Sequence, residues 1–328
     1  MNILITGVAG LIGSNFADWL IENDKADNVV GVDDLSGGYI DNVNEEVIFH
    51  KENLIEDNLN YIFERYKFDL VYHFAAYAAE GLSPFMRVFN YKNNLIATTR
   101  LITLSIKHNI KRFIFTSSMA TYGRGKPPFD EKDILQPIDP YGIAKFACEM
   151  DLRVANEQHG LDFCIIKPHN VYGPKQNIWD KYRNVLGIWI NQHLNGKPIT
   201  IFGSGDQRRA FSYVGDCVEP LWNAGTREAA SKQTINLGGT KDISINEAAD
   251  TLIEVMGGGS KVTLTARHEV KHAWSTWDKS IKLLTYKENH TLKEGLSIMW
   301  VWAKKQPKRT QQIWESYELD KGMYDFWR

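Results

Sequence analysis

The sequence predicts an α/β protein built on a doubly wound parallel sheet. Short, continuously apolar runs alternate with longer segments of helical periodicity through the first half of the 328-residue chain. Continuous apolar runs are typical of strands buried on both faces, and their alternation with helices is typical of parallel sheets. A glycine-rich turn separates the first run from the first helical segment.

The elements of the first half follow in order from these patterns. The apolar runs predict six strands, at Ile3–Thr6, Val29–Val32, Val47–His50, Leu70–Ala75, Arg112–Ser117 and Phe163–Lys167. The helical patterns predict four helices, at Ser14–Ile21, Leu54–Tyr66, Asn90–His108 and Pro140–Glu157.

After Lys167 the sequence is richer in loops. It predicts helices at Asn184–Asn195, Asp216–Gly225 and Asn246–Met256, strands at Ile199–Phe202, Ala210–Val214 and Thr234–Leu237, and a Trp-rich helical tail from Leu292. No low-complexity linker separates two halves. We therefore expect a first domain over residues 1–167, with returning segments near 210–240, and a smaller discontinuous lobe over residues 168–209 and 241–328.

Composition excludes several classes of protein. Hydrophobic content is 43% and charged content 24%, as in a globular protein with a substantial core. The net charge of -2 argues against a nucleic-acid or polybasic membrane surface. We find no secretory signal and no apolar stretch that could cross a bilayer, so we expect a cytoplasmic protein. The three widely spaced cysteines predict buried thiols rather than a metal site.

The glycine-rich turn has the spacing of a phosphate-binding loop. Gly7, Gly10 and Gly13 follow the first strand and open the first helix, where free N–H groups face an anion. Asp33 ends the second strand, 20 residues after Gly13. A carboxylate there accepts hydrogen bonds from a ribose diol and repels a 2′-phosphate. The sequence therefore favours NAD over NADP as cofactor.

A second motif points to proton chemistry. Tyr141 and Lys145 lie four residues apart, on one face of a predicted helix. An adjacent ammonium lowers the pKa of a phenol, so we expect Tyr141 to act as a base. The hydroxyl of Ser118 completes a three-residue catalytic set.

Together these motifs resemble the extended short-chain dehydrogenase/reductase family, especially the NAD-dependent nucleotide-sugar epimerases and dehydratases. The resemblance covers nearly the whole chain, and its main segments are 6–14, 32–36, 73–76, 90–94, 115–123, 141–145, 167–174 and 202–214. It implies a Rossmann-type sheet with a smaller, discontinuous C-terminal substrate-binding lobe. It also implies a homodimer formed through two long helices, Asn90–His108 and Pro140–Glu157.

The resemblance also assigns roles to individual residues. It implies that Ser118, Tyr141 and Lys145 are catalytic. The residues that it assigns to the cofactor are Gly7, Gly10, Leu11, Ile12, Gly13, Asp33, Asn53, Leu54, Phe74, Ala75, Ala76, Asn94, Thr116, Tyr141, Lys145 and Pro168. Those that it assigns to a nucleotide-diphosphate sugar are Ser118, Met119, Tyr141, Asn170, Arg209 and Arg267.

Two departures from the family patterns narrow the activity. Dehydratases and decarboxylases of the family carry acidic residues just after the catalytic Ser, where this chain has Met119 and Ala120. Dehydration is therefore disfavoured. Ala78 stands where some UDP-galactose 4-epimerases have a Lys, which leaves the subfamily open.

We expect a 4-epimerase of UDP-hexoses, UDP-N-acetylhexosamines or UDP-hexuronates, most like UDP-glucose 4-epimerase. Such an enzyme oxidises C4 of the sugar transiently, lets the 4-keto sugar rotate, and returns the hydride to its other face. A dehydratase, decarboxylase, reductase or C3/C5 epimerase of the same superfamily remains an alternative. A non-catalytic NAD-binding regulator is an alternative of another class, and an NADP-dependent reductase is disfavoured by Asp33.

Overall fold

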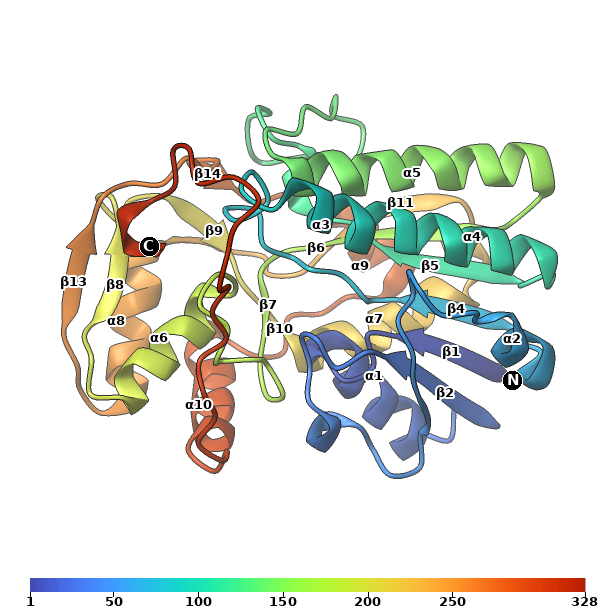
Figure 1. Ribbon diagram of the computed structural model, residues 1–328, viewed down its shortest axis with the longest axis horizontal. Helices are drawn as coiled ribbons and strands as arrows, with labels where there is room; N and C mark the ends of the chain where they lie inside the picture. Colours follow the sequence, from blue (N-terminus) through green and yellow to red (C-terminus); the bar gives the residue numbers. More distant parts are fainter. Residues whose placement is uncertain (328) are drawn as a thin grey trace.

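A seven-stranded sheet, entirely parallel, forms the centre of the protein. The computed structural model describes residues 1–327, and Figure 1 shows the sheet between two layers of helices. The strand order is β11-β6-β5-β4-β1-β2-β3. The strands are β1 (Asn2–Thr6), β2 (Asn28–Asp33), β3 (Ile48–Lys51), β4 (Leu70–His73), β5 (Arg112–Thr116), β6 (Phe163–Pro168) and β11 (Gln233–Leu237). This topology confirms the predicted Rossmann-type fold.

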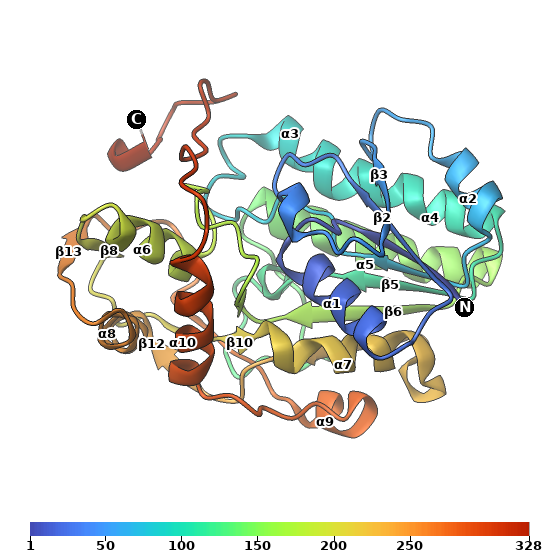
Figure 2. The ribbon, with the colours of Figure 1, turned by 90° about the horizontal axis from the view of Figure 1, so that it is seen from below.

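Each face of the sheet has its own apolar core. One core contains Phe16 and Leu20 of α1 (Leu11–Glu22) and Leu221 of α7 (Val214–Thr226), with α9 (Asp278–Leu284) beside them. The other contains Leu101 of α4 (Ala97–Lys107) and Leu152 of α5 (Pro140–His159), with α2 (Asn60–Tyr66) nearby. Figure 2 shows the two helical layers on opposite sides of the sheet.

The remaining elements form a third apolar cluster beside the sheet. They are α6 (Val185–Leu194), α8 (Ile245–Met256) and α10 (Leu292–Ala303), the parallel pair β8 (Ile199–Phe202) and β13 (Lys261–Leu264), and the group β12 (Asp242–Ser244), β9 (Arg208–Ala210) and β14 (His272–Ala273). The parallel pair β7 (Val171–Tyr172) and β10 (Ser212–Tyr213) lies where the chain passes between this cluster and the sheet.

Several predicted boundaries were wrong. The helix expected at Leu54–Tyr66 begins only at Asn60, because the side-chain oxygen of Asn53 accepts hydrogen bonds from the N–H groups of Ile55 and Glu56 and holds a turn there. The fourth strand ends at His73 rather than Ala75. The strand expected at Ala210–Val214 is divided between β9 and β10, and α7 already begins at Val214.

The helix expected at Asn90–His108 has an irregular centre. It consists of α3 (Arg87–Tyr91), a π-helical segment at Lys92–Ile96, and α4. A π-helical turn inserts an extra residue and rotates the side chains that follow it. It therefore shifts which residues of this helix face the sheet.

The C-terminal segment, residues 304–327, is not the predicted helix but a long irregular strap. The helix α10 ends at Ala303, and the strap crosses to the loop between β4 and α3 (Figure 1). There the side chains of Met323 and Trp327 pack with Phe85 and Tyr182. The carboxylate of Glu318 accepts hydrogen bonds from the N–H groups of Val88 and Phe89, at 2.7 and 2.8 Å, where α3 begins. Among the described residues, no helix is long and apolar enough to cross a membrane.

We expect Trp327→Ala to loosen the strap without unfolding the sheet, because Trp327 is buried only in the small cluster beneath the strap. Tryptic cleavage after Lys321 should become roughly tenfold faster, while the melting temperature changes little. Ile313→Ala, which alters an exposed strap residue, is the matched control. Unchanged cleavage in Trp327→Ala would contradict this role of the indole.

Candidate active site

A cavity of about 760 Å³ opens along the carboxyl edge of the sheet. Its walls come from the loops after β1, β2, β4, β5 and β6 and from the third cluster and the strap. The strand order reverses between β1 and β4, so α1, which follows β1, and α4, which comes after β4, cover opposite faces of the sheet. Ligands of doubly wound sheets bind in this crevice.

The glycine-rich turn forms one end of the cavity. Gly7 has a φ of +73°, and a Cβ placed on it would lie 2.6 Å from the backbone nitrogen of Ala75. A Cβ on Gly13 would lie 2.2 Å from the carbonyl oxygen of Gly7. Gly10 precedes α1, whose N-terminus no described side chain caps. The turn is therefore a backbone cradle that only glycine permits, and its free N–H groups suit a pyrophosphate.

Asp33 lies beside this cradle with both carboxylate oxygens held. One accepts from the N–H of Ala9 at 3.0 Å and the other from the N–H of Leu35 at 2.8 Å. Burial raises the pKa of Asp33, while these two hydrogen bonds oppose the shift. Asn53 lines the cavity nearby and donates to Asp34 at 2.9 Å. Its side-chain oxygen accepts hydrogen bonds from the N–H groups of Ile55 and Glu56 in the local turn.

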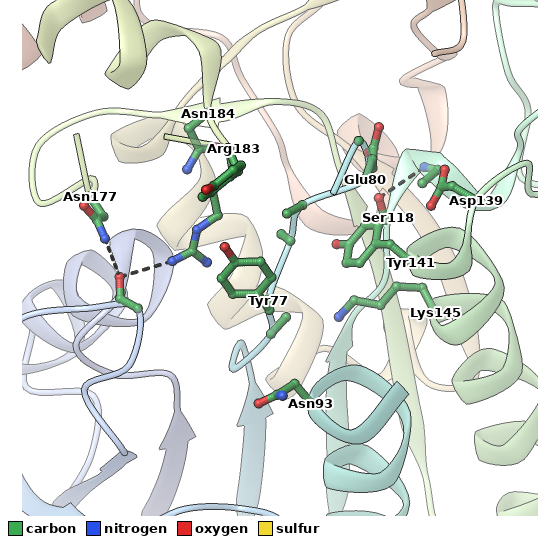
Figure 3. Close-up of a pocket in the computed structure, with 18 of the residues that line it drawn as sticks. Tyr77, Glu80, Asn93, Ser118, Asp139, Tyr141, Lys145, Asn177, Arg183 and Asn184 are labelled. Carbon is green, nitrogen blue, oxygen red and sulfur yellow. Dashed lines mark hydrogen bonds between the residues drawn. The ribbon is translucent and has the colours of Figure 1, made fainter. Parts of the chain in front are cut away.

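Ser118, Tyr141 and Lys145 meet on one wall of the cavity (Figure 3). Pro140 opens α5, and Asp139 caps it by accepting from the N–H of Gly142 at 2.8 Å. This cap places Tyr141 in the first turn of the helix. The ammonium of Lys145 donates to the carbonyl of Thr116 at 2.8 Å and lies 5.9 Å from the centre of the Tyr141 ring.

The electrostatics of this trio differ from our expectation. Burial raises the pKa of Tyr141, and the nearby charge of Glu80 raises it further, while a hydrogen bond with Ser118 opposes the shift. Burial also lowers the pKa of Lys145 to about 8. The expected lowering of the Tyr141 pKa was wrong for the protein alone, because burial is the largest influence on the phenol and raises its pKa. A positive charge or a further hydrogen bond beside the phenolate would lower this pKa.

A buried ion pair, Glu149–Lys167, lies beside the Ser118–Tyr141–Lys145 trio. The ammonium of Lys167 lies 3.2 Å from the carboxylate of Glu149, and both side chains are almost fully buried. Glu149 also accepts a short hydrogen bond from the hydroxyl of Ser117, and Lys167 lies 4.3 Å from the centre of the Tyr122 ring. The network ties α5 to β5 and β6, and so fixes Ser118 relative to Tyr141.

Three further residues predicted to bind a diphosphate sugar, Asn170, Arg209 and Arg267, line the same cavity. Arg209 donates to the carbonyls of Val270 and Lys271, at 2.6 and 2.9 Å. Arg267 lies 3.3 Å from the carboxylate of Glu269, which is 3.6 Å from Arg209. Asn170 lines the same space and donates to the carbonyl of Ala210 at 2.8 Å. Two guanidinium groups that share one carboxylate suit a diphosphate, which carries more charge than Glu269.

The cavity thus brings together nearly all the predicted site residues. Besides those described above, it is lined by Leu11, Ile12, Leu54, Phe74, Ala75, Ala76, Thr116, Met119 and Pro168. The exception is Asn94, whose buried side chain accepts from the N–H of Tyr77 and donates to its carbonyl. Its neighbour Asn93 lines the cavity instead.

Residues 3–238 match the family model described as the NAD dependent epimerase/dehydratase family. The chain belongs to this family. The match confirms the resemblance seen in the sequence and the prediction of NAD as cofactor.

Several family members are similar to this chain over most of both lengths. An uncharacterised UDP-glucose epimerase of Bacillus subtilis is 31% identical, over 90% of this chain and 96% of its own. The UDP-glucose 4-epimerase of Thermotoga maritima, solved with UDP-glucose, is 32% identical, with a TM-score of 0.87 over 93% of this chain and 99% of that one. The UDP-glucuronic acid 4-epimerase of Bacillus cereus, solved with UDP-glucuronic acid and NAD, is 29% identical, with a TM-score of 0.85 over the same shares.

Several lining residues of this epimerase/dehydratase family member were missed from the sequence. Tyr77 and Glu80 follow β4 in the loop that covers the cavity, and Asp139 caps α5. The sequence could have predicted these residues as cavity residues only from their position, just after a strand or just before a helix. Arg183 lies 4.5 Å above the Tyr77 ring, and it and Asn177 donate to the carbonyl of Gly37 (Figure 3). Lys321 and Tyr324 reach the cavity from the strap, which no local pattern placed there.

Two further observations concern residues outside the cavity. His169 is fully buried beside Trp277, and burial lowers its pKa to about 4. It is a neutral packing residue. Within residues 1–327, no group of three His, Cys, Asp or Glu side chains is placed to hold a metal ion.

The lowered pKa of Lys145 predicts a pH-dependent stability for the cofactor-free protein. The folded chain binds this proton less tightly than the unfolded chain, so the free energy of unfolding rises with pH between about 8 and 10.5. From pH 8 to about 9.5, below the ionisation of unfolded tyrosines, wild type should gain about 2 kcal/mol relative to Lys145→Met. Urea unfolding at several pH values measures this difference, and parallel curves for the two proteins would contradict it.

Proposed function

We propose that the protein is an NAD-dependent 4-epimerase of a UDP-sugar. The observation that carries the proposal is the joint presence, around one cavity, of the glycine cradle, the Ser118–Tyr141–Lys145 trio and the Arg209–Arg267 pair. The similar proteins named above, solved with UDP-glucose or with UDP-glucuronic acid and NAD, support the same substrate class.

The residues divide the chemistry as follows. Bound NAD supplies the acceptor, and later the donor, of the C4 hydride. Tyr141 takes the proton of the 4-hydroxyl, Ser118 holds that oxygen, and Lys145 stabilises the phenolate. Arg209 and Arg267 hold the diphosphate while the 4-keto sugar turns, and Tyr141 then returns the proton. The anchored nucleotide keeps the reactive ketone in the site.

The cofactor roles given to residues 7–13, Asp33 and the loop at 74–76 belong to this proposal. So does the division into a cofactor domain, residues 1–167 with segments near 210–240, and a sugar-nucleotide lobe, residues 168–209 and 241–328. The three buried, free cysteines support a reducing compartment, so we place the enzyme in the cytoplasm and in carbohydrate biosynthesis.

The decisive experiment is proton NMR of UDP-glucose incubated with the enzyme. We expect conversion to UDP-galactose with no net consumption of NAD. Tyr141→Phe should bind NAD and UDP-glucose normally in calorimetry, yet lose turnover by roughly 10²- to 10⁴-fold, because the base is removed while the ring remains. Tyr61→Phe, a change at an exposed tyrosine of α2, is the control. Near wild-type turnover in Tyr141→Phe, or a 4-keto-6-deoxy product, would refute the proposal.

We also propose that the enzyme is a homodimer. Ile143, Met150 and Val154 are exposed apolar residues on α5, and Ile96 is exposed at the start of the adjacent α4. Two such helices from each subunit would bury these side chains in a four-helix bundle.

Charges on this face should prevent the association, because they would be buried unpaired at the interface. Met150→Asp combined with Val154→Asp should give a folded monomer in light scattering, where the wild type is a dimer. Ile281→Asp, at an exposed position of α9, serves as control and should remain dimeric. A monomeric wild type would show that the exposed apolar face has another purpose.

A further inference from the structure

Arg183 reaches from the segment before α6 to both of the loops that flank the glycine cradle. Its Nη2 lies 3.4 Å from the carbonyl oxygen of Gly37, in the loop after β2. Its guanidinium carbon lies 4.5 Å from the centre of the Tyr77 ring, in the loop after β4, and Figure 3 shows these two side chains together. In the sheet, β1 lies between β2 and β4. The guanidinium therefore lies across the loop that follows β1, which is the cradle.

The loop after β2 contacts both the cradle and this guanidinium. A Cβ placed on Gly38 would lie 2.3 Å from the carbonyl oxygen of Ala9, a residue of the cradle. A Cβ placed on Gly37 would lie 2.7 Å from Nη2 of Arg183. Two consecutive glycines thus allow the loop to approach the cradle on one side and Arg183 on the other, which brings the guanidinium close to the cradle.

The guanidinium is held in position, but its hydrogen bonds are incomplete. Nε donates to the carboxylate of Asp180 at 2.6 Å, and the two side chains are only 12% and 2% exposed. Within residues 1–327, Nη1 has no hydrogen-bond partner and Nη2 has only the long contact with Gly37. That carbonyl already accepts from Asn177 at 3.1 Å, so Arg183 is not needed to satisfy it. A largely buried cation with two incompletely bonded nitrogens is costly unless a ligand supplies the missing acceptors.

We infer that Arg183 binds the pyrophosphate of NAD. The cradle offers only backbone N–H groups, whereas a pyrophosphate carries two negative charges. Nη1 and Nη2 form the edge of the guanidinium that binds phosphate oxygens bidentately. Bound NAD is then held both by the loops of the sheet and by the segment before α6. The inference rests on the cofactor role that we proposed for residues 7–13, and not on the identity of the sugar.

Calorimetry of NAD binding to the full chain, freed of copurified nucleotide, tests this role. Arg183→Gln should weaken NAD binding by roughly 10- to 100-fold, because charge-assisted hydrogen bonds are lost. Arg183→Lys keeps the charge without the planar fork, so its Kd should lie between the two. Arg65→Gln is the matched control: Arg65 also lies over a tyrosine ring, 5.2 Å from the centre of Tyr66, but it is exposed on α2 and does not line the cavity.

A double variant removes the effect of an unpaired Asp180. Arg183→Gln leaves this buried carboxylate without its cation, which destabilises the segment by itself. Asp180→Asn combined with Arg183→Gln replaces the ion pair by two amides. The Asn keeps an oxygen for the N–H of Tyr182, which bonds to Asp180 at 2.8 Å. This double variant should lose as much NAD affinity as Arg183→Gln.

Ligand fragments distinguish a pyrophosphate contact from a general loosening of the cavity. ADP-ribose keeps the pyrophosphate of NAD, and adenosine lacks it. Both Gln variants should lose affinity for ADP-ribose and NAD by the same factor, while the Kd of adenosine in an NMR titration stays unchanged. Unchanged NAD affinity in the double variant, or an equal loss for adenosine, would overturn the role of Arg183. Failure of the wild type to convert UDP-glucose would refute the epimerase, but these ratios of Kd values would still decide the role of Arg183.

Discussion

The close approach of the loops after β1 and β4 is the constraint on which the rest of the site depends. These strands are neighbours at the point where the sheet reverses its order, so their loops leave the same edge side by side. Gly7 has no Cβ, and only therefore can the backbone of Ala75 come as near as it does. From Ala75 the chain continues to Glu80 and Ser83, which holds the first turn of α5. The backbone contact between Gly7 and Ala75 thus sets the position of the glycine-rich turn relative to Ser118, Tyr141 and Lys145.

The cavity wall carries charged groups of both signs. The guanidinium groups of Arg209 and Arg267, the carboxyl groups of Glu80 and Asp139, and the Tyr141–Lys145 pair all line it. Beneath them, the Glu149–Lys167 pair is shielded from water and linked to Ser117. Removing one member of a buried pair leaves an unpaired charge, which is far costlier than replacing both. The pair therefore favours one arrangement of β5, β6 and α5. This arrangement also fixes the positions of Ser118, Tyr141 and Lys145.

The sequence predicted the sheet and most of the cavity wall because their signals are local. Strands β1, β2, β5 and β6 were predicted from continuous apolar runs. Gly7 follows β1 directly, Asp33 ends β2, and Tyr141 and Lys145 lie four residues apart in the helix between β5 and β6. Glu80 and Tyr77 were missed because a single carboxylate or phenol in a loop is common, and only its position after a strand could have marked it. Asn93 lines the cavity where Asn94 was expected, and both residues lie in the π-helical segment, whose irregular turn the sequence pattern does not reveal. The raised pKa of Tyr141 depends on burial by distant elements, which local spacing does not reveal.

The positions of the chain ends bear on how the protein should be handled in the laboratory. Met1 pairs with Asp27 at the amino edge of the sheet, on the far side from the cavity. The strap, by contrast, brings Lys321 and Tyr324 to the cavity wall and seats Trp327 beneath it. A purification tag at the C-terminus would add residues close to Trp327 and the aromatic cluster in which it packs. A tag fused before Met1 extends from the opposite edge, so it is the fusion that leaves the sugar end of the cavity undisturbed.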